Sequence, residues 1–492
     1  MIGAPELELS SHFPARALDM ARLAGLSFIG EAPEIYGQDP VLDFPRPIGG
    51  AAATAISLCG DAVAEIWRRR TGEMQRPRVS VREGAAAVTG FALQVLTPSA
   101  MARPSDWEAE AAGWRAWGAR SVLRGENASN PAVGIYRTAD DRWIHIHGGR
   151  PHLAERILRV LATDPSGIAS AILRWEGYKL EEALAAAETC GAVLRTAEEW
   201  LSHPQGMCLA SLPVVEVTRI GDAPRQPLPS GDAPLAGLRT LDLSVALAGP
   251  VCARTLAQHG SEVLHISAPD RIDSQPLEVE TGHGKRSAFI DLKEATGRAA
   301  LAELVKGADV FCQNYRPGGL AGFGFDVDQV AALRPGIIHA SINCYGHTGP
   351  WAQRRGWEGL AQAATGLTIQ HDSTSIPRLA PATFCDYITG YFAARGIMEA
   401  LLRRADEGGT WQVRTSLCQT GMWLERMGLT GGDAAGASEP EAFRDLLVAC
   451  ETPFGRLWHL PPAPQLHVTP PHWDRPPPLP GSQSPRWAEM GE

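Results

Sequence analysis

Apolar residues in the second half of the chain follow patterns that predict strands and helices in turn. Strand-like runs cover residues 238–245, 262–267, 309–314 and 336–343, and helical spacing covers residues 297–307. Strands that alternate with helices favour a parallel sheet with helices packed on it. We therefore expect an α/β fold with a Rossmann-like sheet across residues 238–425.

A smaller α+β unit is predicted upstream, over residues 126–219. Residues 136–148 have the pattern of a hairpin with its turn at Asp140 and Asp141, and helical patterns follow at 153–162 and 180–187. Residues 220–237 are rich in Pro, Gly and Asp, which is typical of a linker. The Pro-rich segment 426–492 is expected to lie over another surface as an extended strap.

Two distant stretches share one pattern. EIWRRRTGEMQRPRVSV starts at Glu65 and EALLRRADEGGTWQVRTSL starts at Glu399, and both follow an Ala-rich helical run. Each is typical of the end of a basic helix, a polar turn and a strand. A repeat at this spacing indicates a duplicated domain. We expect residues 1–125 to be a truncated, degenerate copy of the large domain and residues 238–425 to be the intact copy.

Composition excludes several classes of protein. The 492 residues include 45 Lys and Arg against 55 Asp and Glu, and this net charge of −10 argues against a nucleic-acid coat, although a local basic cluster can still hold a phosphate. The nine cysteines form no CxxC pair, which predicts reduced cytoplasmic thiols and no zinc site. The longest uncharged run, between Glu83 and Arg103, is interrupted by Gly, Gln and Pro, and the first ten residues carry acids, so neither a membrane span nor an export signal is expected.

Three loops at predicted strand ends or turns suit a phosphate-bearing ligand, because backbone amides at a helix start and paired cations both favour anions. Each is equally a common structural feature, so the purely structural reading stays open. The candidate residues are Gly249 and Pro250 in a strand-to-helix turn, Lys285 and Arg286 before a strand, and Asn314, Tyr315 and Arg316 after a strand.

Asp386 lies at the predicted start of a helix, where an acid ordinarily satisfies free backbone N–H groups. A carboxylate there can also act as a covalent nucleophile, and nearby helix amides would keep it ionised. The adjacent Cys385 is a rival nucleophile without a base beside it in sequence. His347, in a glycine-flanked loop, is a second open candidate for structural or catalytic work.

These pieces, in this order, resemble the class III CoA-transferases, the family of formyl-CoA transferase and carnitine CoA-transferase. The resemblance spans residues 235–417 and rests on five motifs: LAGLRTLDLSVALAGP, GKRSAFIDLK, ADVFCQNYRPG, INCYGHTGP and CDYITG. It implies an acyl-CoA donor and a carboxylic acid acceptor, with coenzyme A as co-substrate and no permanently bound cofactor or metal.

The resemblance also assigns roles. Asp386 matches the family's nucleophile, which forms an aspartyl anhydride and then an enzyme-bound CoA thioester. Relatives cradle CoA at the places of Gly249, Pro250, Lys285, Arg286, Asn314, Tyr315 and Arg316.

Two other activities remain open. Racemases of 2-methylacyl-CoA share the fold and carry His after a glycine, where this chain has Gly356, Trp357 and Glu358; His347 is a possible substitute. The third reading is a non-catalytic CoA-binding protein, which the degenerate first copy suggests.

Family members form interlocked dimers with shared sites, so we expect either a homodimer or a pseudo-dimer within one chain. In the first copy, the place of Asp386 falls near Ala51 to Ala53, and no nucleophile is present. The family's glycine-rich shielding loop has only residues 124–127 as its counterpart. Its loss argues against small, oxalate-like acceptors. The many apolar residues near Asp386 would fit a larger, hydrophobic acyl group.

Overall fold

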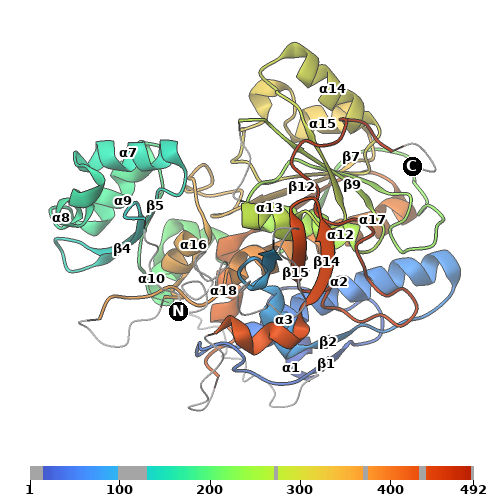
Figure 1. Ribbon diagram of the computed structural model, residues 1–492, viewed down its shortest axis with the longest axis horizontal. Helices are drawn as coiled ribbons and strands as arrows, with labels where there is room; N and C mark the ends of the chain where they lie inside the picture. Colours follow the sequence, from blue (N-terminus) through green and yellow to red (C-terminus); the bar gives the residue numbers. More distant parts are fainter. Residues whose placement is uncertain (1–14, 98–129, 271–274, 369–374, 431–438, 489–492) are drawn as a thin grey trace.

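A seven-stranded sheet forms the centre of the molecule in the computed structural model, which describes residues 15–97, 130–270, 275–368, 375–430 and 439–488 (Figure 1). Six strands run parallel, and the seventh pairs antiparallel at one edge. In chain order they are β7 (Glu216–Gly221), β8 (Arg239–Asp242), β9 (Glu262–Ser267), β10 (Lys285–Phe289), β11 (Val310–Gln313), β12 (Ile338–Asn343) and β13 (Thr410–Ser416).

Across the sheet the order is β10-β9-β8-β11-β12-β13-β7. The chain winds outward from β8 in one direction and resumes at β11 in the other, so the switch of direction lies between these two neighbours. Such a switch opens a crevice at the carboxyl ends of the strands, where α/β proteins bind ligands. The predicted Rossmann-like parallel sheet is confirmed.

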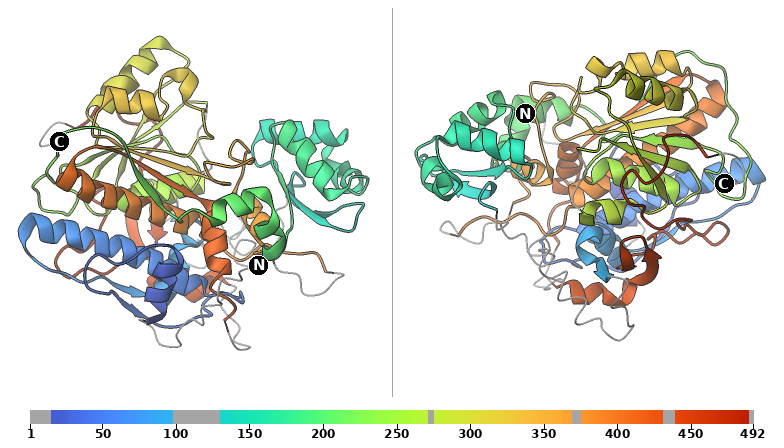
Figure 2. Two further views of the ribbon diagram at one scale, coloured as in Figure 1. Left: turned by 180° about the vertical axis from the view of Figure 1, so that it is seen from behind. Right: turned by 45° about the horizontal axis from the view of Figure 1, so that its top comes forward.

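Helices cover both faces of this sheet (Figures 1 and 2). One face carries α14 and α15, whose apolar residues share a core with β9, β10 and β11. The other face carries α12 and α17. Helix α12 follows β8 directly in the chain, as the predicted strand-to-helix turn at Gly249 and Pro250 indicated. The helices in this half are α12 (Ala248–Ala257), α13 (Gln275–Thr281), α14 (Ala295–Lys306), α15 (Val327–Leu333), α16 (Glu358–Thr365), α17 (Phe384–Glu407) and α18 (Leu417–Glu425), with 3₁₀ turns η2 (Ala321–Phe323) and η3 (Pro440–Leu446).

The N-terminal region packs under α17 rather than forming its own large sheet. Its 24-residue helix α2 lies along α17 within one continuous core. Strands β1 and β2 form a two-stranded sheet, and Arg78 of β2 also makes an antiparallel bridge with Gln465. The elements are α1 (Ala15–Leu23), β1 (Glu34–Tyr36), α2 (Ile48–Thr71), β2 (Arg78–Ser80), α3 (Val81–Ala87), α4 (Gly90–Leu93) and β3 (Val95–Thr97). The duplicated-domain hypothesis stays a prediction.

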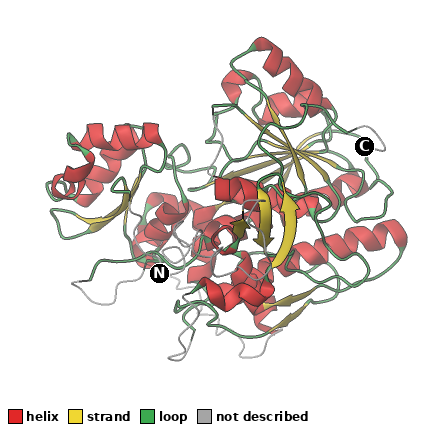
Figure 3. Ribbon diagram, viewed as in Figure 1, coloured by secondary structure: helices red, strands yellow, loops and turns green. Residues whose placement is uncertain are grey.

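The small domain has a three-stranded sheet and its own apolar core (Figure 3). The hairpin turns where expected, and Asp141 takes a left-handed φ of 59°. The elements are β4 (Val133–Arg137), β5 (Trp143–His147), α7 (Pro151–Leu161), η1 (Pro165–Gly167), α8 (Ile168–Ile172), α9 (Gly177–Ala186) and β6 (Gly191–Val193), followed by α10 (Ala197–Ser202) and α11 (Pro204–Ala210). Strand β7, which lies before residue 222, belongs to the large sheet and not to this domain.

The C-terminal segment is extended only in its later part. Strands β14 (Val448–Thr452) and β15 (Gly455–His459) form a hairpin that also pairs with β3. Beyond it, the chain follows the free edge of β10, where Gln483 exchanges hydrogen bonds with the backbone of Ser287. This contact covers an edge that would otherwise expose unpaired backbone groups. No helix within the described ranges is long and apolar enough to span a bilayer.

Candidate active site

Asp386 occupies the first turn of α17, as the third residue of the helix, and its side chain is partly exposed. Glu358, the first residue of α16, reaches across to the same turn. One of its oxygens accepts the N–H of Cys385 at 3.2 Å, and the other accepts the N–H of Asp386 at 2.6 Å. A buried carboxylate 28 residues upstream therefore caps the helix that carries the candidate nucleophile.

Glu358 is itself held in place. Gln362, one turn along α16, donates to the Glu358 carboxylate at 2.9 Å, and its amide oxygen accepts the N–H of Ala380 at 2.8 Å. The residue is only 8% exposed. These contacts restrict the Glu358 carboxylate to the start of α17.

Two carboxyl groups so close together resist being charged at the same time. Burial raises the pKa of Glu358 to about 7, although its hydrogen bonds lower it. Burial first, and then the charge of Glu358, raises the pKa of Asp386 well above its usual range, and a backbone hydrogen bond from Ala248 opposes this. The Ala248 amide favours the ionised form of Asp386, but the two effects in the opposite direction are larger, so the pKa shift runs against the expectation that helix amides keep this carboxyl group ionised.

Cys385 is a poor rival nucleophile. Its side chain is fully buried, and burial together with the charge of Glu358 raises the pKa of its thiol well above the usual range. A thiol that stays protonated reacts slowly.

Asn314, at the carboxyl end of β11, fastens the loop that follows β8. Its side chain accepts the N–H of Val245 at 2.8 Å and donates to the Val245 carbonyl at 2.6 Å. In the same loop, Ala246 has a left-handed φ of 63°, which is uncommon for a residue with a side chain. A Cβ on Gly249 would lie 2.3 Å from the Cβ of Ser244, so only glycine fits there. Asn314 and Gly249 therefore shape the switch point between β8 and β11.

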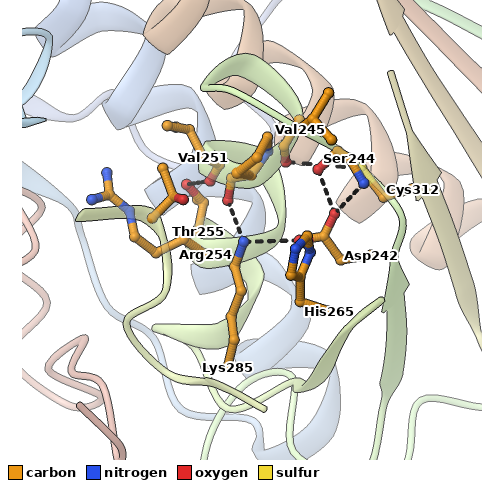
Figure 4. A network of polar contacts seen from close by, with 12 residues as sticks. Asp242, Ser244, Val245, Val251, Arg254, Thr255, His265, Lys285 and Cys312 are labelled. Carbon is orange, nitrogen blue, oxygen red and sulfur yellow. Dashed lines mark hydrogen bonds and ion pairs between the residues drawn. The ribbon is translucent and has the colours of Figure 1, made fainter. Parts of the chain in front are cut away.

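Lys285 turns inward and joins a buried polar network (Figure 4). Its Nζ donates to Asp242 at 2.8 Å and to the Pro250 carbonyl at 2.9 Å. His265 Nδ1 lies 3.4 Å from the same carboxylate, and Ser244 donates its N–H to it. Although burial alone would raise the pKa of Asp242, the Lys285 charge and His265 hold it below its usual range.

Lys285 and Arg286 do not lie before a strand, as the sequence indicated, and their predicted role in CoA binding stays a prediction. Both belong to β10, so successive side chains point to opposite faces. Lys285 pairs with Asp242, and Arg286 pairs with Glu262 at 3.2 Å while it donates to the Arg486 carbonyl at 2.8 Å. Both positive charges are paired with carboxylates within the protein, and the sequence spacing does not reveal these partners.

A cleft with about 390 Å³ of empty volume lies just beyond the carboxyl end of β8, beside His265 in the middle of β9 and the first half of β10. Its wall includes two of the predicted residues, Pro250 and Lys285. Four others named above also line it: Ser244, Val245, Ala246 and His265. Gly249 and Asn314 support the adjoining loop, whereas Tyr315 packs against the core beside β11. Arg316 points toward the small domain, where its Nη1 lies 3.6 Å from Glu188.

The small domain meets α16 next to Glu358. The His147 ring, at the end of β5, stacks on Trp357 with centroids 5.0 Å apart and an interplanar angle of 25°. A Cβ on Gly149 would lie 2.9 Å from His147 Nε2, so a residue with a side chain would crowd the ring there. His347 makes a different contact: its Nε2 lies 3.2 Å from the carbonyl oxygen of Thr415. Burial lowers the pKa of both rings to about 4, so both are neutral.

Sequence reasoning missed Glu358 and His147. An acid directly after Gly356 and Trp357, before a helical run, was the available signal for Glu358. No signal pointed to His147, because its partner is 210 residues away in the chain. Within the described ranges, no three His, Cys, Asp or Glu side chains gather as a metal site would require.

Comparison with known proteins points to one family. Residues 235–447 match the model of CoA-transferase family III. The acetyl-coenzyme A transferase nodX of Hypoxylon pulicicidum is 30% identical over 66% of this chain and 58% of its own length. A succinate–glutarate CoA-transferase of Agrobacterium fabrum is 32% identical over 37% of this chain and 50% of its own.

The chain thus spans only about half the length of the curated relatives it matches. A crystal structure of a CaiB/BaiF family protein from Brucella suis is 29% identical over 39% of this chain and 55% of its own, with a TM-score of 0.37. Through residues 235–447, the chain is similar to CoA-transferase family III.

Proposed function

We propose that this protein transfers coenzyme A from an acyl-CoA to a carboxylic acid, with Asp386 as the nucleophile. One observation carries the proposal: the Asp386 carboxyl group stands at a helix start fixed by Glu358, next to the Ala248 amide of the turn that borders the cleft. The similarity of residues 235–447 to CoA-transferase family III supports the same reaction class.

The first half of the reaction loads CoA onto the enzyme. A carboxylate oxygen of Asp386 attacks the thioester carbonyl carbon, the C–S bond breaks, and CoA leaves as a thiolate with the electron pair. The thiolate then attacks the Asp386 carbonyl of the resulting mixed anhydride. The donor acid leaves as a carboxylate, and CoA is bound to Asp386 as a thioester.

The second half reverses these steps with the acceptor. Its carboxylate attacks the aspartyl thioester, releases CoA thiolate and forms a new anhydride. The thiolate then attacks the acceptor's acyl carbon, which yields the new acyl-CoA and restores the Asp386 carboxylate. Every step exchanges one acyl bond for another, so electrons balance without a further reactant.

Glu358 serves this chemistry by position and by charge. Its bonds to the N–H groups of Cys385 and Asp386 hold the first turn of α17 still, which keeps the nucleophile oriented. Its charge also raises the pKa of Asp386, which makes the carboxylate a stronger nucleophile when ionised. The cleft beside β8, β9 and β10 is the proposed place of the CoA nucleotide.

The deciding experiment seeks a covalent adduct. The protein is incubated with a panel of acyl-CoAs and treated with hydroxylamine or borohydride, and peptides are read by mass spectrometry. We expect a modified residue 386 and none elsewhere. Asp386→Ala serves as the control, and an adduct on Cys385 or no adduct with any acyl-CoA would contradict the proposal.

A 2-methylacyl-CoA isomerase is the second candidate, because the structure supplies a histidine that the local sequence lacks. His147 stacks on Trp357, at the place where racemases carry His after glycine, and Gly149 lets the chain pass close to its Nε2. This reaction would move a proton at the α-carbon between His147 and Asp386. Deuterium uptake from D₂O at that carbon, without any acceptor acid, separates it from CoA transfer.

We also propose that one chain completes the site as a pseudo-dimer. The contact between His147 of the small domain and Trp357 of α16 joins both parts within a single chain. A solution mass equal to one chain, in an active preparation, is the expected result. Activity found only in a dimer would contradict it.

A further inference from the structure

Three arginines converge on one glutamate where the small domain meets the large sheet. Glu188, just after α9, lies 3.2 Å from Arg156, 3.4 Å from Arg355 and 3.6 Å from Arg316. Arg156 belongs to α7, whereas Arg316 follows β11 and Arg355 precedes α16. Three positive charges against one negative leave a net charge of +2 at this junction.

The glutamate does not satisfy its three partners. The neighbouring Arg354 donates to both carboxylate oxygens of Glu182, at 2.6 and 2.7 Å. These distances are shorter than the 3.2–3.6 Å between Glu188 and its three arginines. Burial and the charge of Arg316 lower the pKa of Arg355, and its Nε is buried without a hydrogen-bond partner. Two carboxylate oxygens are too few for three guanidinium groups, so a larger anion with more oxygens would fit better.

Glu188 is also easy to displace. Its side chain is 53% exposed, and its backbone has a φ of 53°, in the left-handed region that residues with a side chain rarely adopt. Exposed ion pairs stabilise a fold only weakly, so the side chain can turn away into water at little cost.

We propose that this cluster is a phosphate-binding site for coenzyme A, in which Glu188 occupies the place of a phosphate group until CoA binds. A phosphate carries up to two negative charges and three terminal oxygens, which match a net charge of +2 and three guanidinium groups. Arg316 stands at the carboxyl end of β11, on the same edge of the sheet as the cleft. Because Arg156 and Glu188 come from the small domain, CoA binding would draw on both domains. The inference rests on the proposed function.

Calorimetric titration with CoA and with 3′-dephospho-CoA tests this site without turnover. Glu188→Gln removes the competing carboxylate, so CoA should bind about three- to tenfold more tightly. Arg355→Ala should weaken binding about tenfold. Glu182→Gln is the matched control, since it neutralises a neighbouring small-domain glutamate that pairs with a single arginine, and it should leave affinity unchanged.

The outcomes separate the two proposals. A gain in Glu188→Gln for CoA but not for 3′-dephospho-CoA assigns the site to the 3′-phosphate, and an equal gain for both assigns it to the pyrophosphate. Unchanged or weaker CoA binding in Glu188→Gln overturns this inference while the proposed function stands. No binding of either ligand to the unaltered protein would overturn the proposed function itself.

Discussion

Helices α2 and α17 pack side by side and share one design. Each has 24 residues, and each ends at a glycine with positive φ, Gly72 or Gly408. In each, a carboxylate from upstream accepts the N–H groups of the second and third helical residues. Asp39 does so for α2 at 3.1 and 2.7 Å, as Glu358 does for α17.

The two helices differ at their third residue. It is Asp386 in α17 and Gly50 in α2. The same cap therefore supports the proposed nucleophile in one helix and a glycine in the other. When the two helices are aligned at their first residues, Gly50 corresponds to Asp386. This is one position before Ala51 to Ala53, the range expected from the sequence. A carboxylate cap orients a helix start, but chemistry there needs a reactive side chain, the Ala248 amide and a cleft.

The largest effect should follow from making α17 resemble α2 at this residue. Asp386→Ala removes the group that forms the covalent intermediate, so CoA exchange should fall at least about a thousandfold. CoA binding should persist, because the cleft and its loops are unaltered. Exchange assays and calorimetry check both parts, and substantial residual exchange would contradict the assigned role.

The second prediction concerns the buried contacts of Lys285 with Asp242 and with the carbonyl of Pro250 in α12. Lys285→Met leaves the Asp242 carboxylate buried without its cation, which should cost about 3–5 kcal/mol of unfolding free energy. Chemical denaturation measures the loss. A double change that also replaces Asp242 with leucine should recover most of it, and a loss of CoA affinity without any loss of stability would contradict this account.

A third change tests the cap of α17. Glu358→Gln removes one charge and one hydrogen-bond acceptor, so kcat should fall about 10- to 100-fold. The charge of Glu358 raises the pKa of Asp386, so its removal should lower that pKa. Less nucleophile is then protonated at a given pH, and the acid limb of the kcat/KM profile should move to lower pH. An unmoved limb would show that the two carboxyl groups do not interact.

The smallest effect is expected at the matching cap of α2. Asp39→Asn keeps one acceptor oxygen and loses the charge, which should cost about 1 kcal/mol of stability. The pH profile of kcat/KM should not move, because no nucleophile follows this cap. A shifted acid limb in Asp39→Asn would show that α2 also takes part in the reaction.

Much of the fold could be predicted because local patterns agree with the tertiary structure. Strand β9 has the predicted bounds 262–267, and α14 and β11 differ from the predicted runs by no more than two residues at either end. The pairing of strands β1 and β2 in a separate small sheet was harder to predict, since a strand's partner depends on which edge is free. Strand β10 includes Lys285 and Arg286, which were expected before a strand, because two cations after a glycine resemble a turn.

The order of motifs and the single aspartate at a helix start were readable from residue types alone, since buried strands, glycine turns and helix caps each impose local composition. The inward path of Lys285, the capping by Glu358 and the meeting of three arginines at Glu188 were decided only by packing. Each joins residues far apart in the chain, and such pairings follow from which face of a strand is covered and which helix ends meet. A one-dimensional pattern carries no record of either.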